Sequence, residues 1–273
     1  MKKCILAAAC SALLLAFTVP GTVNAQTVYA RGQDVSPTYD GWEKNADGSY
    51  TLYFGYFNRN SEEEVNVPIG PDNNIDPGGD RGQPTHFYPD KKWWVFKVVV
   101  PKDWPKDRRV VWTLTTHGRT NQAKGWLQQE WEVDRGVIAK NAARDPSLMT
   151  AGTNERDIDP DNLPPKMTGS PAQTINLSDT PALTATATDD GLPKPVSGSK
   201  GSPPDGVRIR WILYRGPANV RFDPDIMSQR IYGKPATLET KVKFTVPGAY
   251  RLRAIASDGE WFSTYDVDVT VRP

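Results

Sequence analysis

Segments in which apolar and polar residues alternate recur throughout the second half of the chain. Leu and Ala alternate with Thr in residues 183–188, and apolar residues alternate with Arg in residues 250–256. A period of two is typical of a β-strand with one buried and one solvent-exposed face. Five such segments predict that residues 170–273 form a β-sandwich of antiparallel strands, and they span 183–188, 207–214, 241–246, 250–256 and 266–271.

The first half carries β-rich runs separated by turn-forming residues, and these runs span 49–57, 92–100, 109–116 and 125–133. A long polar loop at 68–84 follows a short strand at 65–67. In residues 92–100 both faces are apolar, with Trp93 on one face and Trp94 on the other. This run therefore predicts a central strand covered on two sides. Residues 26–134 are expected to form a second, aromatic-rich β-sandwich, which makes the chain all-β with two sandwich domains in tandem.

Residues 135–169 lose this periodicity and become rich in Asp, Asn and Pro. Paired prolines stiffen a connection, and the missing apolar pattern gives the segment no core of its own. We expect a linker here that joins the two domains. A short helix at 135–143 would be compatible with the sequence.

The first 25 residues have the layout of a cleaved secretory signal peptide. Lys2 and Lys3 precede an apolar run at residues 5–17, and a Pro-Gly pair stands shortly before Ala25. A membrane anchor is the alternative, but the run is shorter than the roughly 20 residues that span a bilayer. A lipoprotein would have to be acylated at Cys10, which lies inside the apolar run. The protein is therefore expected to be secreted or periplasmic, with no membrane span after cleavage.

The rear half resembles the PKD-type immunoglobulin-like modules of bacteria. Three motifs carry the resemblance. The first two are Thr-Asp-Asp-Gly-Leu-Pro at 188–193 and Arg-Trp-Ile-Leu-Tyr-Arg-Gly-Pro at 210–217. The third begins with Pro-Gly-Ala-Tyr at 247–250 and ends with Ser-Asp-Gly-Glu at 257–260. The resemblance implies that Trp211 packs the core, that Tyr250 begins a late strand, and that Asp258-Gly259 turns a hairpin. The sequence departs from the family pattern in a Gly/Ser/Pro-rich insertion at 194–205. Modules of this family imply a spacer or binding role and no chemistry.

The front half resembles uncharacterised exported bacterial proteins. The similarity rests on Gly-Tyr-Phe-Asn-Arg-Asn at 55–60, Val-Pro-Ile-Gly-Pro at 67–71 and Gly-Gln-Pro-Thr-His-Phe at 82–87. This resemblance implies no activity.

Charge and reactive residues exclude several functions. The 33 basic and 32 acidic residues nearly cancel, so the chain has no electrostatic footprint for nucleic acid. Both cysteines lie in the predicted signal peptide, which leaves a mature chain without disulfides or thiolate ligands. His86 and His117 are the only histidines, and neither accompanies the Gly-x-Ser-x-Gly motif of a serine hydrolase. A zinc site would need both histidines to converge with acids from elsewhere in the chain. No catalytic residue and no cofactor other than calcium is predicted.

Calcium is the metal left open by the sequence, because it takes oxygen ligands from flexible acidic loops. Asp72, Asp76 and Asp80 in the long front loop are the candidate ligands. Asp157, Asp159 and Asp161 copy the start of an EF-hand loop, but the glycine and the final glutamate of that motif are missing. The simpler interpretation of both stretches is a solvated acidic loop that makes turns.

Aromatic residues are the most unusual feature of the composition. Seven of the nine tryptophans lie before residue 135. Most rings are expected in the core, but a ring that reaches solvent could stack on a sugar or contact a partner. Trp93, Tyr53 and Trp126 are the candidate binding residues.

A purely structural subunit of a larger surface assembly is one possibility, and two further functions are compatible with these observations. The first is an exported, non-catalytic binding or scaffolding protein of the cell envelope or extracellular space, with a glycan or an envelope protein as partner. The alternative is a carbohydrate-active enzyme, or a carbohydrate-binding accessory, that uses the carboxylates and aromatic rings of the front domain.

Overall fold

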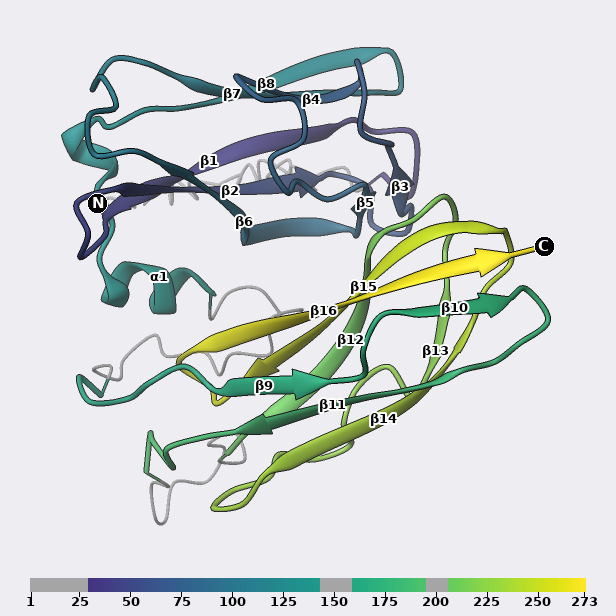
Figure 1. Ribbon diagram of the computed structural model, residues 1–273. Helices are drawn as coiled ribbons and strands as arrows, with labels where there is room; N and C mark the ends of the chain where they lie inside the picture. The colour runs from purple at the N-terminus through teal and green to yellow at the C-terminus, as the bar shows by residue number, and fades with distance from the viewer. Residues whose placement is uncertain (1–28, 143–158, 195–205) are drawn as a thin grey trace, which may run out of the picture.

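The computed structural model describes residues 29–142, 159–194 and 206–273. The predicted signal peptide, most of the insertion at 194–205 and the middle of the predicted linker lie outside the described residues. The regular secondary structure of the described part is almost entirely β-strand, which confirms the all-β fold class. Its two buried cores lie in a front group and a rear group of sheets, and Figure 1 shows the front group above the rear group.

The front sandwich consists of two three-stranded sheets with aromatic rings between them. Trp112 and Phe54 are fully buried there, and the ring of Phe96 lies edge-on against Trp112 at 4.9 Å between centroids. A two-stranded pair, β3 (Val65–Asn66) and β5 (His86–Phe87), flanks the sheets. One sheet has the order β1 (Val35–Lys44), β2 (Tyr50–Asn58), β6 (Asp90–Val100), and the other has the order β4 (Asn73–Asp76), β7 (Val110–Thr116), β8 (Arg119–Gly125).

The rear sandwich has two four-stranded sheets. One has the order β10 (Gln173–Asn176), β16 (Phe262–Arg272), β15 (Gly248–Ser257), β12 (Arg208–Arg215). The other has the order β13 (Arg221–Asp223), β14 (Ala236–Lys243), β11 (Ala182–Thr188), β9 (Lys166–Gly169). Four of these strands match alternating segments, and β14 overlaps the segment 241–246 only at residues 241–243 because it begins at Ala236. The three short strands β9, β10 and β13 were not predicted. Strand β9 pairs with β11 and lies in the segment that the sequence suggested as linker.

The three residue roles implied by the PKD resemblance are present in the rear sandwich. Trp211 is 1% exposed in the core. The hydroxyl of Tyr250 donates to the carbonyl of Val246 at 2.7 Å, a corner that fixes the start of β15. Asp258 and Gly259 form the turn between β15 and β16, and their strands pair from Ser257 opposite Phe262.

The predicted strand at 125–133 is wrong. His117 and Gly118 both have positive φ angles, 49° and 74°, as a two-residue type I′ hairpin turn requires. Because the turn is this tight, the chain pairs back at once, and β8 begins at Arg119. The expected strand region instead contains a short 3-10 helix, η1 (Gln129–Trp131).

The predicted position of residues 92–100 is also wrong, because β6 lies at the edge of its sheet and β2 is central. The pairing of β2 with β6 slips near Gly55, and Trp94 has a φ angle of 55°. This bulge turns Trp94 away from the core of Phe96, so Trp93 and Trp94 pack in one cluster with ring centroids 6.2 Å apart. Strict alternation had placed the two rings on opposite faces.

Gly55 is required at this slip. A Cβ atom there would lie 2.2 Å from the carbonyl oxygen of Lys92 and 2.3 Å from the carboxylate of Asp40. The same carboxylate accepts the backbone N–H of Trp94 at 3.0 Å and pairs with Lys91 at 3.1 Å. The bulge is therefore fixed by a buried, paired acid.

A helix of about two turns follows the front sandwich. Helix α1 (Arg135–Ala142) confirms the short helix suggested for this region, and it lies between the two sandwiches in Figure 1. Within the described residues, we find no helix with the length and apolar character needed to cross a membrane.

Candidate functional site: a cavity between the sandwiches

The two sandwiches contact each other through an apolar cluster on the outer face of β6. Trp94 from the front sandwich and Ile255 and Trp261 from the rear sandwich are buried together with Ile138 of α1. Half-buried rings surround them, among them Tyr53, Trp93 and Phe262. Burying these side chains at one contact favours a fixed arrangement of the sandwiches.

Backbone hydrogen bonds join the segment around β5 to strand β12. The N–H of Thr85 donates to the carbonyl of Tyr214 at 3.2 Å, and the N–H of Leu213 donates to the hydroxyl of Tyr88 at 2.9 Å. The hydroxyl of Tyr214 in turn donates to the carbonyl of Gly82 at 2.5 Å. Strand β12 is irregular at this point, because its register against β15 shifts between Leu213 and Arg215. The front sandwich thus provides partners at the irregular end of a rear strand.

Two arginines complete the contact. Arg215 makes a bidentate ion pair with Asp80, with N–O distances of 2.8 and 2.9 Å, and donates to the carbonyl of Gln83. Arg253 lies 3.5 Å from the ring centroid of Tyr214, pairs with Asp266, and donates to the carbonyl of Val95 at 3.1 Å. Arginine suits both sites because its planar group can pair and stack at once.

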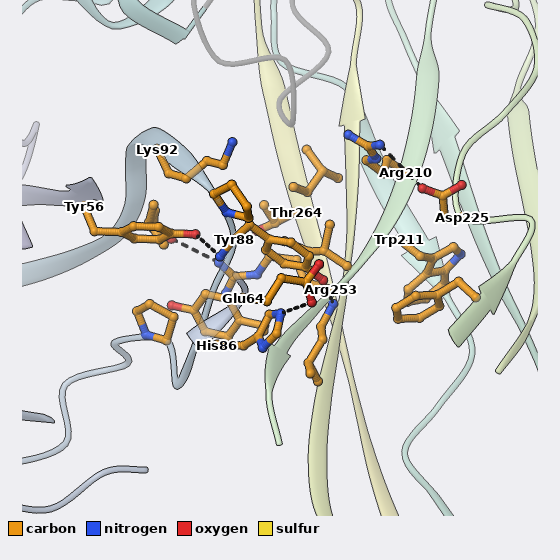
Figure 2. A pocket seen from close by; sticks show the side chains of 18 of the residues that line it. Tyr56, Glu64, His86, Tyr88, Lys92, Arg210, Trp211, Asp225, Arg253 and Thr264 are labelled. Carbon is orange, nitrogen blue, oxygen red and sulfur yellow. Dashed lines mark hydrogen bonds and ion pairs between the residues drawn. The ribbon is translucent and has the colours of Figure 1, made fainter. Parts of the chain in front are cut away.

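A cavity of about 560 Å³ remains between the sandwiches beside these contacts. This size is in the range of sites that hold small molecules. Its walls come from both sandwiches, with Tyr88 and Trp93 on one side and Phe222 and Phe262 on the other. Figure 2 shows charged side chains among these rings, including Glu64, Arg210, Asp225 and Arg253.

The charged groups of the cavity are held in place by one another. Arg210 pairs with Asp225 at 3.4 Å. Glu64 lies 3.1 Å from Nε2 of the buried His86, and Nδ1 of that ring lies 2.8 Å from Asn66. Both ring nitrogens of His86 therefore have side-chain partners, and the contact with Nε2 holds the carboxylate of Glu64 at the cavity wall.

Tyr88 is the polar group best placed to serve a ligand. Burial raises the pKa of its hydroxyl above the usual value, so the group keeps its proton throughout the ordinary pH range. The oxygen already accepts the N–H of Leu213, which leaves its hydrogen free to orient toward an acceptor. The site can thus offer flat rings, guanidinium donors and carboxylate acceptors, all fixed before a ligand arrives.

The sequence-derived binding candidates fall in two places, because Trp93 and Tyr53 belong to one cluster and Trp126 does not. Trp93 lines the cavity, with Lys91 lying 4.0 Å from its ring centroid. Tyr53 lies next to it in the apolar cluster, packed edge-on against Trp94, with its hydroxyl bonded to Glu43. Trp126 is remote from this group and stacks on Tyr39 with ring centroids 6.3 Å apart.

Sequence reasoning missed the rear half of the site. The Arg residues of β12 and β15 were recognised only as the polar positions of alternating strands. That same alternation was the available signal, because it places Arg210 and Arg253 on the outer face of their sheet. Nothing in the pattern indicates that a second sandwich covers this face.

The front-loop calcium candidates are not brought together at the cavity. Asp80 is committed to Arg215, whose hydrogen bonds hold the pKa of that carboxyl below its usual value. Asp72 and Asp76 are exposed, and none of the three lines the cavity. Across the described ranges, no three His, Cys, Asp or Glu side chains already converge as a closed metal site.

Comparisons with known proteins give fold likenesses only. No model of a protein family matches the chain, and no curated protein matches it. Among solved structures, the major subunit of aggregative adherence fimbriae type I from Escherichia coli is 14% identical, with 42% of this chain and 99% of that chain covered and a TM-score of 0.28.

Two further solved structures are similar at the same level. A human PKD domain is 17% identical over 44% of this chain and 91% of that chain, with a TM-score of 0.22. Fibronectin(III)-like modules of Clostridium thermocellum are 12% identical over 86% of this chain and 94% of that chain, with a TM-score of 0.24. Scores this low carry no argument about function, and the fold class rests on the strands and their pairing.

Proposed function

We propose that this chain is an exported, non-catalytic binding protein of the cell envelope or extracellular space, and that it holds a segment of carbohydrate in the cavity between its two sandwiches. The observation that supports the proposal is the cavity itself, which both sandwiches line with aromatic rings and paired charges. The predicted signal peptide and the absence of cysteine from the sequence after residue 10 favour export.

A carbohydrate suits the chemistry of this cavity. Sugar rings have apolar faces that can pack on flat side chains such as Trp93 and Phe222, and their hydroxyls both donate and accept hydrogen bonds. Arg210 and Arg253 supply donors, while Glu64 and Asp225 supply acceptors. Such a mixture of apolar walls and a few fixed polar groups is typical of small-molecule sites.

The interface supports a scaffolding role as well. Thr85, Tyr88 and Arg215 form hydrogen bonds across the contact, and these bonds restrict the movement of one sandwich relative to the other. A ligand that touches both walls would then meet a preformed site, which lowers the entropic cost of binding.

The enzyme alternative requires carboxylates of the front domain at the cavity, and Glu64 and Asp90 are front-domain acids in its wall. Asp72, Asp76 and Asp80 of the long front loop line no part of that wall, and Glu64 lies 3.1 Å from Nε2 of His86. The aromatic walls and the paired charges of the cavity support binding as the leading function.

A binding assay on the full mature chain tests the proposal. Neutral and uronic-acid oligosaccharides are titrated while tryptophan fluorescence and heat of binding are recorded. Trp93→Ala should weaken binding about tenfold or more, as expected for a large aromatic residue in a binding site. Trp126→Ala is the matched control, since that ring is half-buried but remote from the cavity.

Binding that survives Trp93→Ala, or that is lost in Trp126→Ala, would overturn the proposed site. Absence of binding to every member of the panel would overturn the carbohydrate assignment. Release of reducing ends from an oligosaccharide by the wild-type chain would favour the enzyme alternative.

A further inference from the structure

Five buried side-chain oxygens in the described residues lack any hydrogen-bond partner, and four of them belong to one end of the rear sandwich. These four are Oδ1 of Asn162, Oδ1 of Asp189, Oδ2 of Asp258 and Oε1 of Glu260. Buried polar atoms in folded proteins are almost always paired, so a group of unpaired acceptors needs an explanation such as an ion or water.

Three loops bring these residues together. Asn162 stands just before β9, Asp189 just after β11, and Asp258 and Glu260 lie in the hairpin between β15 and β16. The ends of these strands meet on the α1 side of the rear sandwich (Figure 1). The carboxamide of Asn162 donates to Oε2 of Glu260 at 2.9 Å, which ties two of the loops side by side.

The second oxygen of each acid is already used by the protein. Oδ1 of Asp258 accepts the N–H groups of Glu260 and Trp261, and Oδ2 of Asp189 accepts the N–H of Gly191. Glu260 accepts from Asn162 and from the N–H of Asp159. The side chains are therefore oriented by these bonds, and each leaves one oxygen without a donor.

The exposed fractions are very small, at 4% for Asp258, 2% for Glu260 and 0% for Asn162. Burial and the nearby acids Asp189 and Glu260 raise the pKa of Asp258 to about 7. Arg135 donates to the backbone carbonyl of Asn162 and stacks on Trp261, and Arg230 donates to the carbonyl of Ser257. Among the described residues, no ion pair joins these acids to a lysine or arginine, and unpaired negative charge is costly in a buried setting.

We propose that this cluster is a calcium site in which Asn162, Asp189, Asp258 and Glu260 contribute one oxygen each. Carboxylate and carboxamide oxygens are the donors that Ca²⁺ prefers. The three carboxylates do not yet converge on one point. Ca²⁺ tolerates this because its shell of six to eight oxygens is flexible and includes water. The proposed site therefore requires the Asp189 loop to move toward the hairpin when the ion binds.

The proposed ion has a structural consequence. Asn162 belongs to the segment that leads from α1 into β9, and Arg135 of α1 holds its carbonyl at 2.9 Å. An ion bound to Asn162 and to the hairpin would fasten this connecting segment to the rear sandwich. This inference does not depend on the carbohydrate proposal, because the cluster shares no residue with the cavity wall.

The test uses the full mature chain, treated with chelator and then titrated with calcium chloride. Saturating calcium, at about ten times the Kd, should raise Tm by roughly 3 to 6 °C. Magnesium chloride is the control ion and should give a smaller rise, since Mg²⁺ demands a tighter octahedral shell. The Kd is expected near the 10⁻⁴–10⁻³ M that is typical of extracellular modules.

Isosteric variants locate the site. Asp258→Asn and Glu260→Gln should each weaken calcium binding about tenfold or more, measured by calorimetry, because each removes a charge from an oxygen ligand. In chelator, Asp258→Asn should melt at the same temperature as wild type or higher, since it removes an uncompensated buried charge. Asp190→Asn is the matched control, because both oxygens of Asp190 already accept backbone N–H groups, from Leu163 and Leu192.

Three results would overturn the inference. The first is a wild-type chain whose Tm does not respond to calcium up to about 10 mM, well above the Kd range of extracellular modules. The second is calcium binding that persists unchanged in both Asp258→Asn and Glu260→Gln. The third is binding that is lost instead in Asp72→Asn, which would return the site to the front loop.

Discussion

The hydroxyl of Tyr88 provides a one-atom test of the contact between the sandwiches. It accepts the N–H of Leu213 at 2.9 Å, and Leu213 is only 2% exposed. Tyr88→Phe removes the acceptor and leaves that N–H buried without a partner, a loss of about 1–3 kcal/mol. The same substitution preserves the ring, so the packing at the cavity wall is retained.

Hydrogen exchange reports this loss directly. The amide of Leu213 should exchange about 5- to 150-fold faster in Tyr88→Phe, which is the stated free energy converted to a rate ratio. Urea unfolding followed by tryptophan fluorescence should show a lower midpoint. Tyr53→Phe is the control, since it removes a hydroxyl that bonds to Glu43 within the front sandwich and should leave the Leu213 amide unchanged.

Unchanged exchange at Leu213 in Tyr88→Phe would refute the reasoning, because it would mean that this hydroxyl is not the acceptor. A slowed exchange would be equally inconsistent. Equal acceleration in both variants would point to general loosening of the front sandwich rather than to a broken contact.

Three further substitutions probe other parts of the structure. Trp112→Ala should lower the free energy of unfolding by about 3–5 kcal/mol in urea titrations, because the ring is fully buried among Phe54, Phe87 and Phe96. Gly55→Ala should destabilise the chain by well over 1 kcal/mol, because its Cβ would meet the Lys92 carbonyl; a melting curve like that of wild type would contradict this. In calcium-free buffer, the free energy of unfolding should fall by at most about 4 kcal/mol as the pH rises from about 4 to 7. The cause is Asp258, whose carboxyl has a pKa of about 7 in the folded chain and of about 3.8 in the unfolded chain, so that only the folded chain holds the proton in this range. Asp258→Asn should flatten this pH profile, and a variant with the same slope as wild type would exclude Asp258 as its source.

The rear sandwich could be predicted well because its strands have one solvent-exposed face and one buried face. The alternation of Arg with apolar residues in β12 and β15 identified the core side of each strand. The short strands β9 and β10 have no fully buried residue, so their sequences carry no comparable signal.

The front sandwich was harder for two local reasons. A bulge at Trp94 turns the side chain of this residue to the opposite face of the strand from the one that alternation predicts. A two-residue turn at His117-Gly118 makes β8 begin earlier than its polar sequence suggests. A single residue of slip is enough to move a side chain to the opposite face of a strand.

The candidate site could be predicted only in its front part. Trp93 was found because it is a large ring on an apolar strand. Asp80 and Arg215, by contrast, are 135 residues apart along the chain, and many contacts use backbone carbonyls, which any residue type provides. The four unpaired oxygens were hidden for the same reason, since three separate loops supply them.

The edge position of β6 has a consequence for assembly. An edge strand exposes unpaired backbone groups that can template the addition of another strand. Here Arg253 donates to the carbonyl of Val95, and Arg81 donates to the carbonyl of Val99, each at 3.1 Å. Two guanidinium groups from elsewhere in the fold thus occupy acceptors that an incoming strand would need. This edge is protected from strand exchange and from edge-to-edge aggregation, even though the strand itself is long and apolar.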